Sequence, residues 1–368
     1  MHTPEIDGRP TVQGISIIDF HVHFRMAHDG LTRSLAGGQF EGVAPDGVEI
    51  GHVREDETGG SCESNDEAQR KSAAVTARTS ENWRRSWDFA DPDSPELDSG
   101  WEAEADRWIQ ELGKHSIEFA NFVTAGGDSE MESLVARGRG AFSGMAAMKD
   151  PFAPGAADAL EEAIVTKGLS GLKVFAPLMS ERIDSANDAV WRVAARYNVP
   201  VIIHFGHCGS AGGIAHNATS TPAWLEGLAK RFPEVPFVIP HFGIQHVQDV
   251  LFLMWACPNV AVDTSGSNQW VRYMASKLTL EDLFRRFYET VGPDRIIFGS
   301  DSSWFPRGFA RRYLVDQLRI CWEMGMPAAD IQRIFGGNAA ALLRLDSWTP
   351  ADLDLTGPVS NAPNLPRL

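Results

Sequence analysis

The fold is decided by one stretch of the sequence, GLKVFAPLMSERIDSANDAVWRVAARYNVPVIIHF, which covers residues 171–205. Two short apolar runs, at 171–175 and 201–205, enclose a stretch of helical character at 187–197. A strand, a helix and a second strand in this order predict two parallel strands with the helix packed against them. Because both runs are apolar at almost every position, we expect the strands to be buried on both faces.

The same alternation continues on both sides of this stretch. Runs typical of strands occur at 16–20, 117–124, 141–148, 171–175, 201–205, 237–240, 260–263 and 296–299, and helical stretches at 156–167, 187–197, 222–232, 281–291 and 308–324. Eight such units predict an α/β fold, a (β/α)8 TIM barrel, which needs about 250 residues. A doubly wound open sheet is the alternative, but DFHVH at 19–23 stands where that fold has a glycine-rich phosphate turn.

A long insertion after the first strand, residues 24–99, breaks the regular pattern. A loop between a strand and a helix needs only a few residues, so we interpret the insertion as a lid over the end of the barrel where active sites lie. It includes a predicted helix at 66–88. We therefore expect one barrel domain at 1–345, with the lid inserted, and an extended C-terminal tail at 346–368.

Four tryptophans lie in or just after this insertion, at positions 83, 87, 101 and 108. Aromatic side chains at helical spacing usually pack into a core, so we expect them to pack beneath the lid. A surface that meets a substrate or a second subunit is the alternative.

The composition limits the classes of partner. The chain of 368 residues has 33 Lys and Arg against 49 Asp and Glu, a formal net charge of −16, which disfavours binding to the nucleic acid backbone. No apolar run approaches the roughly 20 residues of a membrane-spanning helix. The N-terminal residues lack the pattern of a secretory signal, so we expect a cytoplasmic protein. Its four cysteines form no C-x-x-C pair, which predicts neither disulfides nor a thiolate zinc site.

Histidines and one aspartate stand at the ends of the predicted strands: His21, His23, His204, His241 and Asp301. The strand ends of a barrel meet at one mouth, so these residues should form a single cluster. Residues two apart on a strand share a face, which points His21 and His23 to the same side. Imidazole nitrogen and carboxylate oxygen are ligands for a divalent metal ion. Because burying so many polar groups without a partner is costly, the pattern predicts a metal site.

Several further stretches carry a resemblance to a known family. They are IIDFHVH at 17–23, GLK at 171–173, VIIH at 201–204, VIPHFG at 238–243, IIFGSD at 296–301 and GNAA at 337–340. In this order they make the chain similar to the amidohydrolase superfamily, and within it to the amidohydrolase-related branch of the aminocarboxymuconate-semialdehyde decarboxylase-like enzymes. The resemblance covers residues 15–345.

The resemblance implies one divalent metal ion, zinc or, as the alternative, manganese, held by His21, His23, His204 and Asp301. It also implies that His241 acts on the substrate or on water. Such an ion lowers the pKa of its water toward 7 and polarises a substrate oxygen, while a neighbouring imidazole moves the proton. We hypothesise that Asp301 both binds the metal and accepts a proton.

Four other residues are candidates for supporting roles. Lys173 lies where some superfamily members carry a carboxylated lysine between two metals. We favour one metal, with Lys173 as a partner either of a substrate carboxylate or of the residues around the metal, and the two-metal alternative stays open. Arg25 suits an acidic substrate, because a guanidinium forms two hydrogen bonds to a carboxylate. His207 either contacts the substrate or makes a hydrogen bond within its loop. Asp263 either supports the site or meets a substrate anion.

Two reactions fit this set of residues. The first is metal-dependent hydrolysis of a lactone, amide or related bond in a small, carboxylated substrate by an activated water. The second is non-oxidative decarboxylation, as in the aminocarboxymuconate-semialdehyde decarboxylase type. Several decarboxylases of the branch carry glutamate in place of the first histidine of the pair, and this chain has His21, so we favour hydrolysis.

A barrel that binds without catalysis is a third hypothesis, of a different class. The complete set of predicted ligands argues against it. Members of the branch often form dimers, and the insertion offers a surface for a homodimer.

Overall fold

The computed structural model describes residues 12–24, 101–207, 220–303 and 307–346, residues 305, 348 and 349, and a few short pieces before residue 100. The predicted lid at 24–99 and the predicted tail at 346–368 lie almost entirely outside these residues. Within the predicted helix at 66–88, five residues are described, and all five are helical: Lys71, Ala74, Val75, Arg78 and Asn82. Trp83 and Trp87 are not among the described residues.

All eight predicted strands are present, with ends that differ from the predicted ones by at most three residues. They are β3 (Ile17–His23), β6 (Ile117–Thr124), β7 (Phe142–Gly144) with β8 (Ala146–Met148), β9 (Leu172–Phe175), β10 (Val201–His204), β11 (Phe237–Ile239), β12 (Val260–Asp263) and β13 (Ile296–Ile297). The predicted strand at 141–148 is divided at Met145 into β7 and β8. Every residue of β9, β10 and β11 is buried, which confirms that these strands are covered on both faces.

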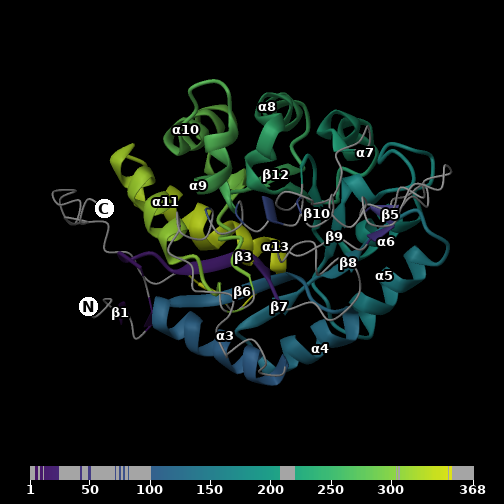
Figure 1. Ribbon diagram of the computed structural model, residues 1–368, viewed down its shortest axis with the longest axis horizontal. Helices are drawn as coiled ribbons and strands as arrows, with labels where there is room; N and C mark the ends of the chain where they lie inside the picture. The colour runs from purple at the N-terminus through teal and green to yellow at the C-terminus, as the bar shows by residue number, and fades with distance from the viewer. Residues whose placement is uncertain are drawn as a thin grey trace.

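The strands pair in parallel in two ladders, β13-β12-β11-β10-β9-β8 and β3-β6-β7 (Figure 1). The ladders adjoin at Met145, whose N–H donates to Phe122 O at 2.9 Å. At the other seam, the N–H of Phe20 donates to Phe298 O at 3.1 Å, and the N–H of His23 donates to Ser302 O at 2.8 Å. The strands therefore follow one another around an α/β barrel, although no continuous ladder closes it among the described residues.

Helices cover the outer face of the sheet (Figure 1). They are α3 (Trp101–His115), α4 (Asp128–Arg137), α5 (Ala156–Val165), α6 (Ala189–Tyr197), α7 (Leu225–Arg231), α8 (Val247–Ala256), α9 (Ser267–Trp270), α10 (Leu280–Val291), α11 (Arg311–Glu323) and α12 (Ala328–Gln332), whereas α13 (Asn338–Leu343) packs against strand residues of the inner face. Two separate antiparallel pairs consist of β1 (Glu5–Ile6) with β2 (Arg9–Pro10) and β4 (Gly42–Val43) with β5 (Glu49–Ile50). None of the described helices has the length and apolar character required to cross a bilayer.

Local sequence explains where the predicted helices begin and end. Thr279 caps α10 through a reciprocal pair of bonds: Asp282 N–H donates to Thr279 Oγ1 at 3.0 Å, and Thr279 N–H donates to Asp282 Oδ2 at 2.8 Å. The helix α6 ends at Asn198, which adopts the left-handed conformation with φ of 47°. These signals set the helix ends independently of packing.

The core has two parts, on opposite faces of the sheet. Between the sheet and the helices lie Val201, Ile203 and their neighbours, together with the fully buried Trp108 and Trp191. On the inner face, Ile18, Phe20, Ile202, Val238 and Ile297 meet Ala339, Ala340 and Leu343 of α13. Alternate residues of each strand thus point into and out of the barrel, and the strand ends are left to carry the polar residues.

Candidate metal centre

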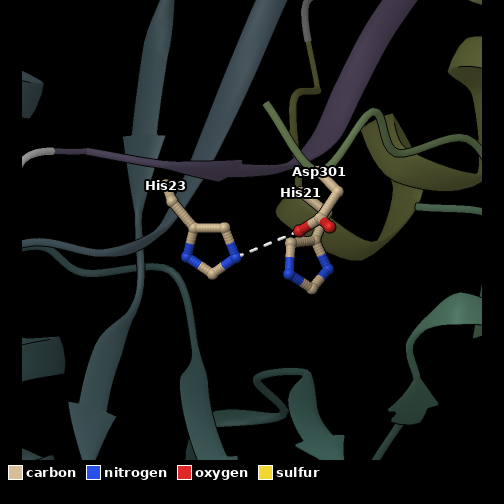
Figure 2. A group of neighbouring side chains, drawn as sticks. All are labelled: His21, His23 and Asp301. Carbon is tan, nitrogen blue, oxygen red and sulfur yellow. Dashed lines mark ion pairs between the residues drawn. The ribbon is translucent and has the colours of Figure 1, made fainter. Parts of the chain in front are cut away.

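Three of the predicted ligands lie together at the mouth of the barrel. His21 and His23 come from β3 and Asp301 from the loop after β13, and a ligand atom of each lies within 4.8 Å of those of the other two. Figure 2 shows the ring of His23 directed at the carboxylate of Asp301, with Nε2 and Oδ1 3.2 Å apart. The ring centroids of His21 and His23 are separated by 5.1 Å. The first and last strands of the barrel thus supply one cluster.

A buried carboxylate, Asp19, joins these two parts of the chain. Its Oδ1 accepts hydrogen bonds from the N–H of His21 at 3.2 Å and from the N–H of Ser300 at 2.9 Å. The Ser300 hydroxyl donates to Oδ2. Burial raises the pKa of Asp19 to about 7, against the lowering effect of these bonds. Asp19 therefore holds β3 to the loop that carries Asp301, across 281 residues of sequence.

The loop that carries His241 has a strained backbone. His241 and Phe242 have φ of 60° and 50°, in the left-handed region that costs a residue other than glycine about 1–3 kcal/mol. The ring of Phe242 is fully buried, with centroids 5.2 Å from Phe284 and 4.8 Å from Phe287 of α10. This packing offsets the strain and holds the ring of His241 beside His204, with centroids 5.0 Å apart.

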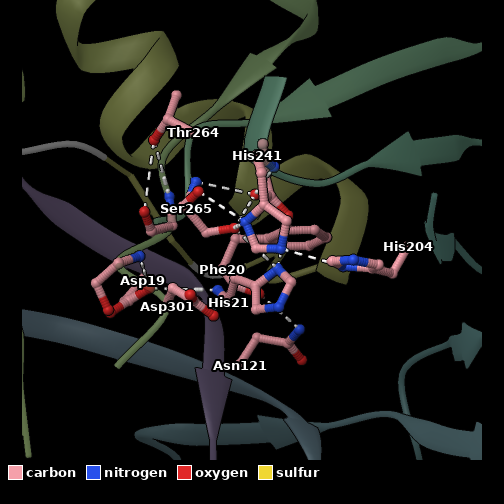
Figure 3. Close-up of polar contacts among 12 residues, drawn as sticks. Asp19, Phe20, His21, Asn121, His204, His241, Thr264, Ser265 and Asp301 are labelled. Carbon is pink, nitrogen blue, oxygen red and sulfur yellow. Dashed lines mark hydrogen bonds and ion pairs between the residues drawn. The ribbon is translucent and has the colours of Figure 1, made fainter. Parts of the chain in front are cut away.

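In two of the imidazoles, one ring nitrogen forms a hydrogen bond with a backbone carbonyl. A carbonyl can only accept, so this nitrogen carries a proton. Nδ1–H of His241 donates to Ser265 O at 2.7 Å, and Nε2–H of His204 donates to His207 O at 2.8 Å. In the neutral rings the other nitrogens carry lone pairs, and these face each other at 3.2 Å (Figure 3). Two facing lone pairs repel, so this geometry favours a proton or a metal cation at this position. Burial, with His241 and Lys173 nearby, holds the pKa of His204 well below its usual range, which disfavours the proton.

His21 presents a third lone pair. Its Nδ1 lies 2.7 Å from Asp263 Oδ2, and among the described residues no hydrogen-bond partner reaches its buried Nε2. Burial lowers the pKa of His21 to about 4, so the ring is neutral near pH 7. A buried, unsatisfied nitrogen costs about 1–3 kcal/mol, a cost that a metal ligand bond would remove.

Asp301 adds a negative charge to these nitrogens. Burial alone would raise the pKa of its carboxyl, but the hydrogen bond from His23 and the electrostatic interactions with His241, His23 and Arg307 outweigh this effect and hold that pKa well below the usual range. The carboxylate is therefore ionised at neutral pH. Neutral imidazole nitrogens with one carboxylate are the donor set that Zn²⁺ and similar divalent ions accept, so these residues fit a metal ion.

The other residues that were predicted from the sequence differ in how they relate to this cluster. His204 and His241 lie next to each other. The nitrogens of His204 are not among the ligand atoms of the group formed by His21, His23 and Asp301. Lys173 of β9 is only 1% exposed, and its positive charge lowers the pKa values of His21, His23 and His204. His207 is exposed, and its Nδ1 lies 2.7 Å from Gln245 Oε1, as in the loop hydrogen-bond alternative. Arg25 lies outside the described residues.

Besides the support from Asp19, sequence reasoning missed three contributors to the site. Thr124 ends β6 and places its hydroxyl 2.7 Å from Nδ1 of His23. Ser265 follows Asp263 closely, and its carbonyl accepts the proton of His241 Nδ1. Arg307 lies in the same loop as Asp301, close enough to help lower the pKa values of His23 and Asp301. The signal for Thr124 and Ser265 was their place at or just after a strand end, whereas Arg307 lies ten residues beyond the end of β13 and gave no such signal.

Comparisons with solved structures identify the fold. A TIM-barrel protein from Bordetella bronchiseptica, Bb4693, is 16% identical, with 90% of this chain and 99% of that chain covered and a TM-score of 0.57. The 5-carboxyvanillate decarboxylase LigW from Sphingomonas paucimobilis is 15% identical, with 90% and 99% covered and a TM-score of 0.55. LigW2 from Novosphingobium aromaticivorans, a structure with bound manganese, is 14% identical, with 90% and 98% covered and a TM-score of 0.51. These likenesses show the TIM-barrel fold.

Comparisons of sequence identify the family. The protein FluG of Emericella nidulans is 30% identical over 114 residues, a match that spans 30% of this chain and 13% of the fungal protein. The model of the amidohydrolase family matches residues 18–345, from the first barrel strand to beyond α13. Since this match covers most of the chain, including every described residue of the candidate metal centre, the chain belongs to the amidohydrolase family.

Proposed function

We propose that the protein is a metal-dependent hydrolase that acts on a small, carboxylated organic substrate such as a lactone or an amide. The observation that carries the proposal is the buried Nε2 of His21, which has no partner among the described residues and belongs to a ring grouped with His23 and the ionised Asp301. The proposal gives this atom a function, since an imidazole nitrogen in this position is a ligand for a metal ion.

In this proposal His21, His23 and Asp301 hold one divalent ion, zinc or manganese, and His204 supplies a further ligand. When bound, such an ion lowers the pKa of a water molecule and polarises a substrate oxygen. The neutral state of His21 supports this role, because only an unprotonated nitrogen binds a metal.

Two side chains are placed to move protons. Asp301 is ionised, so its carboxylate is able to accept a proton from the attacking water. His241 keeps its Nδ1 proton on Ser265 O, which leaves Nε2 as the nitrogen that takes up a proton and returns it to the leaving group. The strained loop fixes this ring, so the direction of Nε2 is set before the substrate binds.

Positive charge beside the site supports a carboxylated substrate. Lys173 and Arg307 both act electrostatically on His23, from β9 and from the loop after β13 respectively. A substrate carboxylate held by these groups would place the bond to be cleaved near His241 and Asp301. Arg25 stays a candidate for the same role.

Non-oxidative decarboxylation is a second candidate. It is supported by the fold likeness to LigW, a 5-carboxyvanillate decarboxylase. The same ligands and the same cations would serve that reaction, with His241 Nε2 giving the proton to carbon in place of the lost carboxylate. The two reactions differ in their products, so a direct measurement separates them.

The test uses the zinc- or manganese-loaded protein with a panel of lactones, amides and carboxylated phenols in ¹⁸O-labelled water. Hydrolysis places ¹⁸O in the product, whereas decarboxylation releases CO2. Asp301→Asn should abolish turnover of whichever substrate reacts, and the matched control Asp158→Asn, an exposed residue of α5, should not. Release of CO2 without ¹⁸O in the organic product would replace the first candidate by the second, and full activity of Asp301→Asn would refute both.

A further inference from the structure

Asp263, the last residue of β12, lies behind the candidate metal centre and is completely buried. Its Oδ2 lies 2.7 Å from Nδ1 of His21. Its Oδ1 accepts from the N–H of His241 at 3.2 Å, from the N–H of Ser265 at 3.0 Å and from the Ser265 hydroxyl. One carboxylate therefore contacts both the strand that supplies two predicted ligands and the loop that carries His241.

We propose that Asp263 is a positioning residue that fixes the tautomer of His21, with the proton on Nδ1 and the lone pair on Nε2. A carboxylate only accepts hydrogen bonds, so a contact of 2.7 Å requires that Nδ1 of His21 carries the proton. The remaining nitrogen, Nε2, is buried and has no hydrogen-bond partner among the described residues. The part of this inference that concerns metal binding rests on the proposed function. The tautomer itself is a property of the metal-free protein and does not depend on that function.

The two oxygens of Asp263 are not equivalent, and this makes the proposal testable by replacing one oxygen with an NH2 group. Oδ1 accepts three donors, two of them backbone N–H groups that cannot reverse their direction. In Asp263→Asn the amide oxygen must therefore replace Oδ1, because an NH2 group there would face two backbone N–H groups that can only donate. The NH2 group then replaces Oδ2 and faces Nδ1 of His21.

An NH2 group at this position can only donate, so Nδ1 of His21 has to accept. The ring proton then moves to Nε2, the atom that the proposal assigns to the metal. Loss of a group that orients a metal-binding histidine typically lowers metal affinity by about 10–100-fold. We expect Asp263→Asn to weaken zinc binding by this factor, although the substitution preserves shape and leaves no cavity in the barrel.

The experiment measures the tautomer directly in metal-free protein labelled with ¹⁵N-histidine, by long-range ¹H–¹⁵N correlation, with His21 assigned through the His21→Gln variant. Wild-type protein should show a protonated Nδ1 and an unprotonated Nε2 at His21, and Asp263→Asn should show the reverse. The control is Asp19→Asn, an equally buried carboxylate that accepts from the backbone N–H of His21 and not from its ring. It should keep the wild-type tautomer.

Zinc affinity of the same samples, measured by competition with a chelator, separates the two proposals. A tautomer that reverses in Asp263→Asn, without zinc binding in the wild type, would refute the metal-dependent function and keep the role of Asp263. Zinc binding that is equally tight in wild type and Asp263→Asn would refute the role of Asp263 in metal binding and keep the function. A tautomer that is unchanged in Asp263→Asn would refute its role in fixing the ring. If Asp263→Asn does not fold, the wild-type spectrum decides, since a proton on Nε2 of His21 would overturn the inference.

Discussion

Gly266 lies so close to the candidate metal centre that an added methyl group would displace the Asp301 carboxylate. A Cβ atom at this position would lie 2.8 Å from Oδ2 of Asp301 and 3.4 Å from Nδ1 of His241. Ordinary van der Waals contact begins at 3.4 Å, so in Gly266→Ala the Asp301 carboxylate has to move by about 0.6 Å. A displacement of this order at a reacting group reduces a rate by up to about 100-fold. We expect Gly266→Ala to weaken zinc binding at least about tenfold, as loss of an orienting group does.

The substitution has a second effect that needs its own control. Gly266 has φ of 60°, where alanine costs about 1–2 kcal/mol more than glycine. Gly155, at the start of α5, has φ of 80°, and a methyl group added there would have no atom within 4 Å, so Gly155→Ala carries the backbone cost alone. Both variants should lose similar free energy of unfolding in a denaturant titration, whereas only Gly266→Ala should lose zinc affinity. Equal zinc affinity in the two variants would refute the placement of Asp301 at the metal.

Three further predictions concern stability. Removal of bound metal by a chelator should lower the melting temperature reversibly, because an ion present at 100 times its Kd stabilises the folded state by about 2.7 kcal/mol; an unchanged melting temperature would contradict a metal site. Phe242→Ala should cost about 3–5 kcal/mol of unfolding free energy, since it removes a buried ring from its packing against α10; a loss below about 1 kcal/mol in urea would show that this ring does not anchor the loop. The hydrogen bond from His115 lowers the pKa of Glu111 to about 2, so stability from this residue is present above the usual carboxyl pKa and is lost as pH falls toward 2; Glu111→Gln should flatten that part of the acid-unfolding curve, and an unchanged curve would contradict the assignment.

The strands and their order were predictable because each is a short apolar run between turn signals. The break at Met145 was not, since it arises where the chain changes neighbours: Met145 N–H bonds to Phe122 O, and the next N–H, of Ala146, bonds to Gly171 O. Such a change depends on tertiary contacts and leaves no mark in the local pattern.

The predicted helical stretches overlap the helices α5, α6, α10 and α11, each of which has one polar face. The helices α3, α4 and α8 were not among the predicted stretches. Of these, α8 has the sequence VQDVLFLMWA, which is apolar on nearly every side. Two large apolar residues of α8 are even exposed to solvent: Phe252 is 63% exposed and Trp255 is 76% exposed. A helix of this kind lacks the periodic contrast on which sequence reasoning depends.

The convergence of His21, His23 and Asp301 followed from the barrel alone, since strand ends meet at one mouth. The direction of His241 did not, because it depends on a left-handed backbone at His241 and Phe242 that the sequence does not indicate. The support from Asp19 was likewise invisible, since its partner Ser300 lies 281 residues away. Position along a strand predicts which residues gather, whereas ring orientation and hydrogen bonding require the folded chain.

The central claim is that His21, His23 and Asp301 form a metal site, and elemental mass spectrometry of protein purified without added metal tests it most directly. The account predicts about one zinc or manganese per chain, and loss of that metal in Asp301→Asn, as expected for a catalytic site with one ion. About two ions per chain would instead support a carboxylated Lys173 and contradict a single-metal site. A chain that holds no metal even after zinc is supplied would contradict the claim itself.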